Sequence, residues 1–272
     1  MGGSSMRGQG GRKPVSAAPA KLMPVRPVSR DFDSLRPGFA ARLDAAAEAL
    51  GLALSPEQSA RLLDYLALLS RWNSAYNLTA VRDPAEQLVL HLFDCLAVVP
   101  PLAVRLAEGD TVADIGSGGG LPGVVLAICL PRVTVHTVDA VGKKAAFVTQ
   151  VKGALGLGNL HAHHSRCETL VPGRDLAPAR IVVSRAFASL LDFTSLTAGL
   201  LAADGVWAAM KGIDPRDELT ELASAPVRHL STERLQVPEL DAERHLLWLA
   251  RAGAGVGSGG PSGGGHAGGQ GA

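Results

Sequence analysis

The stretch TVADIGSGGGLPG, from Thr111 to Gly123, decides the fold of this chain. Its first half is a short apolar run ending at Ile115, which is typical of a strand in a buried parallel sheet. Glycines then let the backbone turn tightly and approach a ligand with no side chain in the way. Leu121 and Pro122 restart the chain as a helix, since proline at a first helical position gives up only an orphan amide hydrogen. Strand, glycine turn and helix together predict one half of a doubly wound fold.

Two acidic residues indicate which ligand suits this turn. Gly118, Gly120 and Gly123 satisfy the dinucleotide pattern, so a nicotinamide or flavin cofactor is one alternative. Asp114, however, lies just before the first glycine, where its charge would repel a pyrophosphate. Asp139 closes the next predicted strand, where an acid can bind ribose hydroxyls. S-adenosylmethionine has no phosphate and carries an ammonium and a sulfonium, so these acids favour it over a dinucleotide. A glycine turn without any ligand is the third alternative.

Composition divides the chain into one folded domain and two tails. The chain has 272 residues and is 47% hydrophobic, which suffices for a sizeable core. Gly, Pro, Ser and Arg dominate residues 1–37, and Gly, Ala and Ser dominate residues 252–272, so both tails are expected to be disordered. The domain between them, 38–251, is predicted to comprise a helical cap, 38–108, and a sheet domain, 109–251.

The net charge of +1 hides an asymmetry between the N-terminal tail and the body. Residues 1–36 hold seven Lys or Arg and two Asp, whereas residues 37–250 hold 18 basic and 23 acidic side chains. An acidic body argues against tight, indiscriminate binding of nucleic acid. Any RNA contact therefore requires a local basic patch or the tail.

The sequence predicts neither export nor membrane insertion. The start lacks the apolar core of a signal peptide, and no apolar run is expected to reach the length of a membrane span. Cys95, Cys129 and Cys167 are an odd number without metal-ligand spacing, which fits reduced thiols. His161 and His163 of the segment HAHH point the same way, but no acid or cysteine completes a metal site. We expect a cytoplasmic protein with no membrane partner and no metal.

Three helices are predicted ahead of the glycine turn. Residues 39–50 have helical spacing, SPEQ at 55–58 is a capping box that opens a second helix, and Asp83 opens a third. The polar, aromatic segment RWNSAYNLTAVRDP, residues 71–84, is predicted to connect the second helix to the third. Its side chains could stack on an unpaired base, or they could be core residues of a helix end and caps of turns.

From residue 111 onward the pattern alternates strand and helix. The predicted strands are 112–115, 133–138, 160–163, 180–184 and 206–210, with helices from 121, over 142–155 and over 190–200, and a last strand at 244–251. This rhythm predicts an α/β fold with a parallel sheet covered on both faces. The carboxyl ends of the strands then bring four charged residues to one edge of the sheet: Asp114, Asp139, Arg185 and Lys211.

Several ordered segments resemble a known family. They are RWNSAYNLTAVRDPAEQLVLHLFDCLAV, DIGSGGGLPG, VDAVGKKAAFV, SRCETL, VVSRAFASL, MKG and QVPELDAERHL, and they span residues 45–251. They are similar to the RsmG/GidB family of bacterial 16S rRNA methyltransferases, of which WNxxYNLT and SRAFASL are the more specific motifs. The resemblance implies a Rossmann-like class I S-adenosylmethionine-dependent methyltransferase with an N-terminal helical cap. It also implies methyl transfer to guanine N7 in the decoding-region loop of 16S rRNA.

The resemblance implies cofactor positions as well. They fall on Gly116, Leu121, Cys167, Glu168 and Arg185, and the loop pattern adds Gly118 and Asp139. Glu168 is expected to accept a hydrogen bond from the adenine amino group, and Arg185 to bind the methionine carboxylate or the target base. Leu90 departs from the family, which often has a basic residue there, so this helix is expected to contribute less to RNA binding.

The chemistry of the acceptor narrows the reaction further. Guanine N7 carries no proton, so transfer to it needs orientation but no general base, and no catalytic residue is predicted. Amino-group methylation would need an Asn/Asp-Pro-Pro-aromatic loop where this chain has SRAF, 184–187, and pyrimidine carbon methylation would need a thiolate there. The guanine must be unpaired or flipped out, because a protein cannot enter the A-form major groove. The predicted substrate contacts are stacking by Phe187 or Tyr76 and phosphate binding by Arg82, Lys143 and Lys211.

The expected partner is 16S rRNA or the small ribosomal subunit. The acidic body favours a structured ribonucleoprotein over protein-free RNA as the substrate. Two alternatives stay open: a methyltransferase of another RNA position or of protein, and a non-catalytic, cofactor-sensing RNA-binding module. A dinucleotide oxidoreductase is a more distant reading.

Overall fold

Seven strands form one sheet within the part of the chain that the computed structural model describes, residues 30–185, 187, 189–212 and 215–253. Their order is β3-β2-β1-β4-β5-β7-β6. The strands are β1 Thr111–Ile115, β2 Thr134–Asp139, β3 Leu160–His164, β4 Ala179–Ser184, β5 Leu201–Lys211, β6 Val227–Arg234 and β7 His245–Arg251. The first five strands in this order, β3, β2, β1, β4 and β5, pair in parallel, as predicted. Strand β7 runs antiparallel between β5 and β6.

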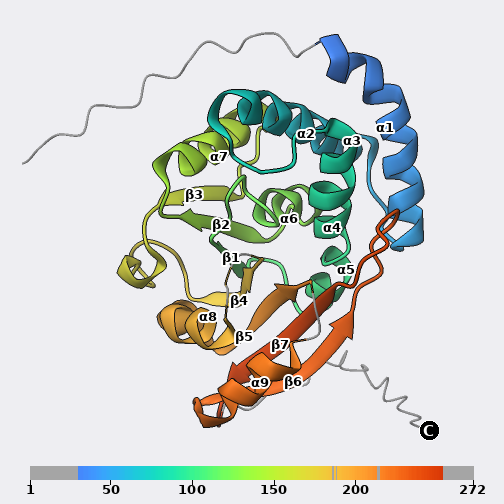
Figure 1. The fold of residues 1–272 in the computed structure, drawn as a ribbon. Coiled ribbons are helices and arrows are strands. Elements are labelled where there is room, and N and C mark those ends of the chain that lie inside the picture. The colour runs from blue at the N-terminus through green and yellow to red at the C-terminus, as the bar shows by residue number, and fades with distance from the viewer. Residues whose placement is uncertain (1–29, 186, 188, 213–214, 254–272) are drawn as a thin grey trace, which may run out of the picture.

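Helices cover both faces of this sheet, as the sequence predicts. Alternate strand residues face opposite ways, so Val112 and Ile181 join one apolar cluster while Ala113 and Val182 join another. Helices α6 (Gly123–Cys129) and α7 (Gly142–Leu155) pack on the first side, and α8 (Leu190–Thr197) and α9 (Arg216–Glu221) pack on the second. Figure 1 shows the N-terminal helices around α6, with the β6–β7 pair at the far end of the sheet from β3.

The first helix corrects the predicted boundary of the N-terminal tail. Helix α1 spans Arg30–Ala49, so residues 30–37 are helical and do not belong to a disordered tail. Phe32 explains the difference, because its side chain is buried and its ring lies 5.6 Å from that of Phe39. The composition of the tail does not reveal that one of its apolar residues, Phe32, is buried. Residues 1–29 and 254–272 lie outside the described residues.

The second helix follows its predicted start but not its predicted end. Helix α2, Pro56–Tyr76, opens with the Ser55–Gln58 capping box. Gln58 also donates from Nε2 to the carbonyls of Ile128 and Cys129, at 3.0 and 3.2 Å, and so caps the end of α6. The helix continues through the first half of the segment predicted as a connection, and it ends at Asn77 in the left-handed conformation.

A mostly apolar helical run completes the cap. It comprises α3 (Pro84–Gln87), the π-helical turn η1 (Leu88–Phe93), α4 (Asp94–Leu96) and α5 (Val99–Ala103). Asp83 caps its start through Oδ1, which accepts the amide hydrogens of the next turn. By length and composition the run Pro84–Ala103 could cross a membrane, contrary to the expectation from the sequence. Within this fold, however, 72% of its most apolar window is buried, as in the core helix of a globular domain.

Candidate active site

The glycine turn leads from β1 into α6 and is held in place by the neighbouring strand. Gly116, Gly118 and Gly120 have φ values of 70°, 58° and 88°, which side chains other than glycine rarely adopt. The Gly118 amide donates to Asp139 Oδ2 at 2.9 Å, and the other carboxylate oxygen accepts the Val141 amide at 2.8 Å. Asp139, at the end of β2, therefore fixes the conformation of the turn.

The beginning of α6 differs from the sequence prediction. The helix starts at Gly123, with Pro122 as its N-cap rather than its first helical residue. Leu121 is buried in the apolar core, so the prediction that it packs against a cofactor has no support from its position. A Cβ on Gly123 would lie 2.5 Å from the methyl group of Thr137 and 2.8 Å from Asp114 Oδ2. The third glycine of the dinucleotide pattern is thus required for helix-to-strand packing.

Asp114 lies inside the fold rather than at its surface. Its side chain is fully buried, and Oδ2 accepts the amide hydrogen of Gly123 at 2.8 Å. Burial raises the pKa of this carboxyl to about 7, although the Gly123 hydrogen bond opposes the change. The expectation that Asp114 faces the ligand beside the loop is therefore wrong. Its position at the end of β1 puts it behind the glycine turn, where it holds the start of α6.

A cleft of about 290 Å³ lies beside the glycine turn, at the carboxyl ends of β1, β2 and β3. It brings together four of the predicted cofactor residues, namely Gly116, Asp139, Cys167 and Glu168. Phe187 lines the same cleft, although the sequence predicted it as a stacking partner of the target base. Ser165, Arg166 and Leu196 also line it and were not predicted. Ser165 and Arg166 belong to the segment SRCETL, from which only Cys167 and Glu168 were assigned to the cofactor, whereas no motif marks Leu196.

Arg185 lies in a second cleft of about 300 Å³. It follows β4, two residues before Phe187, so the loop after β4 contributes to both clefts. Its Nη1 donates to the carbonyl of Leu90 and to Asp94 Oδ2, each at 3.1 Å. Asp94 is buried, and its other oxygen accepts Nε of Arg244 at 2.8 Å. Neither Asp94 nor Arg244 was predicted from the sequence to belong to this site.

The thiols of the described residues are unsuited to nucleophilic attack. Cys95 Sγ lies 4.0 Å from Arg185 Nη1, closer to the site than the sequence suggested. It is fully buried, however, and burial raises its pKa far above the usual value despite the guanidinium. Burial also raises the pKa of Cys167 to about 11, and its thiol donates to Glu168 Oε2 at 3.3 Å. Both groups are protonated thiols near neutral pH.

The predicted RNA contacts do not gather at one place. Tyr76 packs on Trp72 with ring centroids 4.9 Å apart, and Trp72 packs on Phe147 of α7. Tyr76 and Trp72 therefore pack the C-terminal end of α2 against α7. Lys143 Nζ donates to the Tyr76 carbonyl at 2.8 Å, and Arg82 donates to Asn77 Oδ1 at 3.1 Å.

Lys211, at the end of β5, is the predicted phosphate contact that reaches the second cleft. It pairs with Glu218 Oε2 at 2.8 Å and donates to the Phe187 carbonyl at 3.1 Å. This lysine therefore ties the loop after β4 to α9, and its charge is already matched by a carboxylate.

Histidines of β2 and β3 form a stack on the sheet rather than a metal centre. The rings of His161 and His163 each lie 5.0 Å from that of His136, and His136 Nδ1 is 2.8 Å from His163 Nε2. Burial and its two histidine neighbours lower the pKa of His136 to about 4. Within the described residues, no group of three His, Cys, Asp or Glu side chains could hold a metal ion.

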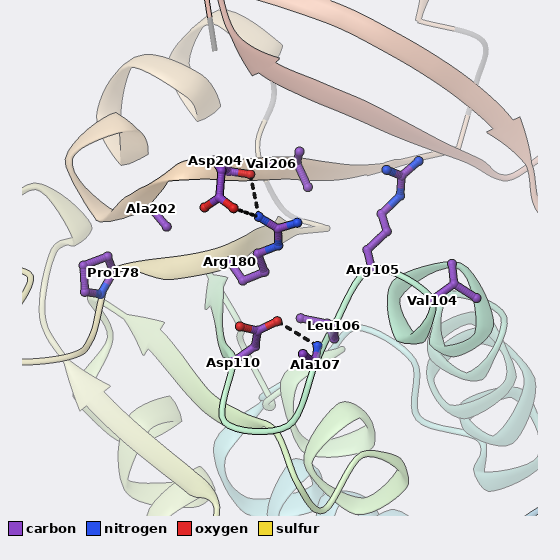
Figure 2. A pocket seen from close by; sticks show the side chains of 10 residues that line it. All are labelled: Val104, Arg105, Leu106, Ala107, Asp110, Pro178, Arg180, Ala202, Asp204 and Val206. Atoms are coloured by element: carbon purple, nitrogen blue, oxygen red, sulfur yellow. Dashed lines mark hydrogen bonds and ion pairs between the residues drawn. The ribbon is translucent and has the colours of Figure 1, made fainter. Parts of the chain in front are cut away.

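A larger hollow lies at the opposite edge of the sheet (Figure 2). Its volume is about 710 Å³, and its mixed polar and apolar walls come from the segment after α5 and from the amino ends of β1, β4 and β5. Figure 2 shows Arg180 bonded to Asp204, and Asp110 bonded to the amide of Ala107. Arg180 and Asp204 pair with each other, and Arg105 lies over the Trp248 ring. Ligands of open α/β sheets bind at the carboxyl ends of strands, not at this edge. The two smaller clefts at that other edge are the candidate active site.

The charges of the cofactor cleft test which ligand the residues fit. The cleft is lined by two acidic side chains, Asp139 and Glu168, and by one basic side chain, Arg166. It therefore suits a cationic ligand better than a pyrophosphate. Gly118 leaves open space where a Cβ would lie, and Asp139 and Glu168 supply acceptors for hydroxyl and amino groups. These features fit S-adenosylmethionine.

The sheet order, the glycine turn and the acid that ends β2 together define a Rossmann-like methyltransferase. The family model of rRNA small subunit methyltransferase G, GidB, matches residues 58–247, and the chain belongs to this family. The ribosomal RNA small subunit methyltransferase G of Acidovorax sp. (strain JS42) is 52% identical over 220 residues, which cover 78% of this chain and 95% of that protein. The protein of the same name from Bordetella avium (strain 197N) is 51% identical over 216 residues, covering 78% and 94%.

Proposed function

We propose that this protein transfers a methyl group from S-adenosylmethionine to N7 of a guanine in the decoding-region loop of 16S rRNA. The observation that carries the proposal is the family match over residues 58–247, which includes every residue that lines the two clefts. The relatives from Acidovorax and Bordetella are named for methylation of small-subunit rRNA. A ribosomal substrate in turn implies action in the cytoplasm.

The cofactor cleft supports the choice of donor. S-adenosylmethionine, when bound, supplies an electrophilic methyl group on a sulfonium. Asp139 keeps its glycine turn in place through the Gly118 amide and presents carboxylate oxygens to the cleft. Glu168 is exposed and its pKa is lowered by its hydrogen bonds with the Glu168 backbone and the Cys167 thiol, so it is an ionised acceptor near neutral pH. Both roles concern binding and orientation.

The second cleft supports the choice of acceptor. N7 of guanine has an in-plane lone pair and no proton, so methyl transfer requires alignment without proton abstraction. The protonated state of Cys95 and Cys167 fits this chemistry, since neither supplies a nucleophile. Arg185 lines the second cleft while Phe187 lines the first, so a base held between them would lie beside the methyl donor. Such orientation can contribute roughly 7 kcal/mol or more.

The substrate must present its base outside a helix. N7 faces the A-form major groove, which is too deep and narrow for protein side chains. A loop guanine avoids most of the few kcal/mol that flipping from a duplex would cost. This requirement supports a loop of 16S rRNA, either protein-free or within the small subunit, as the target.

Labelled S-adenosylmethionine tests the proposal directly. The purified protein would be incubated with it and with 16S rRNA or small subunits from a strain that lacks this methylation. Nuclease fragments would then be mapped by mass spectrometry. We expect 7-methylguanine at one loop position and no label on subunits that already carry the modification. Label on another base or atom, or on a ribosomal protein, would replace this assignment with one of the other acceptors.

A further inference from the structure

A buried carboxylate joins two arginines in the second cleft. Asp94 is only 3% exposed, and its two oxygens accept from different guanidiniums, Arg185 at 3.1 Å and Arg244 at 2.8 Å. The three residues come from α4, from the loop after β4 and from the position just before β7. The side chains of both arginines remain about one quarter exposed, at 27% and 24%. One carboxylate therefore orients two cations that still reach solvent.

The π-helical turn before Asp94 takes part in this arrangement. The Asp94 amide bonds to the carbonyl of Val89, five residues earlier, instead of to that of Leu90 as in an α-helix. The Leu90 carbonyl accepts Nη1 of Arg185 at 3.1 Å. The change of helical register thus provides Arg185 with a second acceptor beside Asp94. π-Helical turns of this kind occur frequently at functional sites.

The charges of the second cleft suit an anion. Arg185, Arg244 and Lys211 line it together with a single acid, Asp94, and Glu218 neutralises the lysine from outside the lining. Two arginines that share one carboxylate leave a positive charge at the mouth of the cleft. Arg244 is held at its backbone as well, because its carbonyl accepts the Leu235 amide at 2.7 Å. Nδ1 of His245, the next residue, is buried and has no hydrogen-bond partner within the described residues.

We propose that Asp94 is a positioning residue of the substrate site and that Arg244, which it orients, binds an RNA phosphate next to the target guanine. The inference rests on the proposed function and adds a phosphate contact that was not among those predicted from the sequence. Arg244 suits the role because guanidinium groups bind phosphate through directed, charge-assisted hydrogen bonds. Arg185, held by the same carboxylate, faces the base at the other side of the cleft.

Loss of the Asp94 charge has opposite effects on RNA binding under the two possible roles of this residue. If Asp94 only added negative charge near the RNA, the Asp94→Asn variant would bind RNA more tightly. If it positions Arg244, the variant binds RNA more weakly although the site has become more positive. We expect KM for the RNA substrate to rise roughly tenfold, as for loss of one charge-assisted hydrogen bond. The change in kcat should be smaller, because Arg185 keeps its bond to Leu90.

The experiment compares Asp94→Asn, Arg244→Ala and the double variant in methyl transfer to small subunits and in RNA binding at several salt concentrations. We expect each single variant to lower the salt slope by about one. The double variant should bind no more weakly than Arg244→Ala, because the two residues act as one unit. Affinity for S-adenosylhomocysteine should stay within about twofold in all three, which excludes a general loss of fold.

Asp64→Asn is the matched control. Asp64 pairs with Arg36 at 2.7 Å between α2 and α1, away from the cleft, so this variant loses the same charge without touching the site. Unchanged or tighter RNA binding by Asp94→Asn, or additive losses in the double variant, would overturn the inference. If Asp94→Asn does not fold, a normal KM and salt slope for Arg244→Ala would overturn it. A wild-type protein that methylates no rRNA would instead refute the proposed function.

Discussion

Three successive amides of the cofactor turn bond to the next strand: those of Gly116 and Ser117 donate to the Val138 carbonyl, and that of Gly118 donates to the Asp139 carboxylate. The Gly118 amide makes its bond to Asp139 with the Gly118 backbone in the left-handed conformation, at a φ of 58°. A Cβ at this position would meet no atom within 4 Å. A side chain at position 118 would therefore cause backbone strain and no steric clash. The strain would change the conformation of the turn.

Gly118→Ala should weaken binding of S-adenosylhomocysteine by about tenfold, because left-handed backbone costs roughly 1–2 kcal/mol for a residue with a Cβ. Calorimetric titration measures the affinity. Gly153→Ala, inside α7, is the matched control, since its Cβ would also meet open space and no left-handed φ is required. That variant should keep its affinity and gain up to about 1 kcal/mol of stability. Equal affinities in the two variants would contradict the role of the turn.

Asp114 gives the protein a pH-dependent stability. Its pKa is about 7 in the folded state and 3.8 in an exposed carboxyl, because burial favours the neutral form. Below the lower value the group is neutral in both states, and above the higher value it is ionised in both. The stabilisation from the neutral form is therefore present at low pH and is lost as pH rises through this window.

Asp114→Asn mimics the neutral carboxyl at every pH and can still accept the Gly123 amide. The free energy of unfolding of the wild type, relative to this variant, should fall as pH rises from about 4 to about 7 and then level off. Urea unfolding across that interval measures the difference. A constant difference would mean that Asp114 does not titrate there.

At the scale of elements, helix α2 supports the cofactor turn directly. The hydroxyl group of Tyr65, which is fully buried, donates to the carbonyl of Gly119 at 2.7 Å. Leu69, one turn later, packs so closely that a Cβ on Gly119 would lie 2.9 Å from its methyl group. The helical cap thus forms part of the cofactor site, not merely a cover on the sheet.

Tyr65→Phe should destabilise the protein by about 1–3 kcal/mol, because it leaves the buried Gly119 carbonyl without a donor. It should also weaken S-adenosylhomocysteine binding, since the turn loses its support from α2. Urea unfolding and calorimetric titration measure the two effects. Ser74→Ala, on the exposed side of the same helix, should change stability by less than about 0.5 kcal/mol. A Tyr65→Phe variant with normal stability and affinity would contradict the coupling.

The core elements could be predicted from sequence because their signals are local. The capping box at Ser55, the helix over Gly142–Leu155 and the strand of the glycine turn are all confirmed. Strand β6 and helix α9 were not predicted. Strand β6 is a polar edge strand that forms by pairing with β7, so its sequence has no apolar strand pattern. The end of α2 was placed too early, because its aromatic and amide residues are typical of a loop. The contact of Trp72 with Phe147, which stabilises this last part of the helix, is not visible in the local sequence.

The candidate site divides in the same way. The residues of the cofactor cleft follow from strand ends and family motifs, and Gly116, Asp139, Cys167 and Glu168 do line one cleft. Asp94 and Arg244 could not be joined by pattern, because they are 150 positions apart and meet only in the folded chain. Asp114 was assigned to the ligand from proximity in sequence, which does not reveal on which side of the turn a side chain lies. The assignment of Leu121 came from the family resemblance and stays a prediction, although its side chain packs in the core.

At the scale of the whole molecule, the cofactor should stabilise the cap and the sheet together. Ligands that bind only the folded state raise the free energy of unfolding by about 2.7 kcal/mol at a hundredfold excess over Kd. S-adenosylhomocysteine should therefore raise the melting temperature, whereas NAD should not, given the two acids of the cleft. Thermal unfolding monitored by circular dichroism checks both ligands. A rise with NAD alone would restore the dinucleotide reading.

The double role of Gln58 has a practical consequence for anyone who wishes to cut or fuse this chain. It caps its own helix and supplies the donor for the last carbonyls of α6. A fragment that starts at the sheet would leave those carbonyls bare, together with that of Gly119. The sheet and its own helices are therefore not expected to fold as a separate domain. Chimaeras and minimal expression fragments should keep residues 30–253 intact and place any junction outside them.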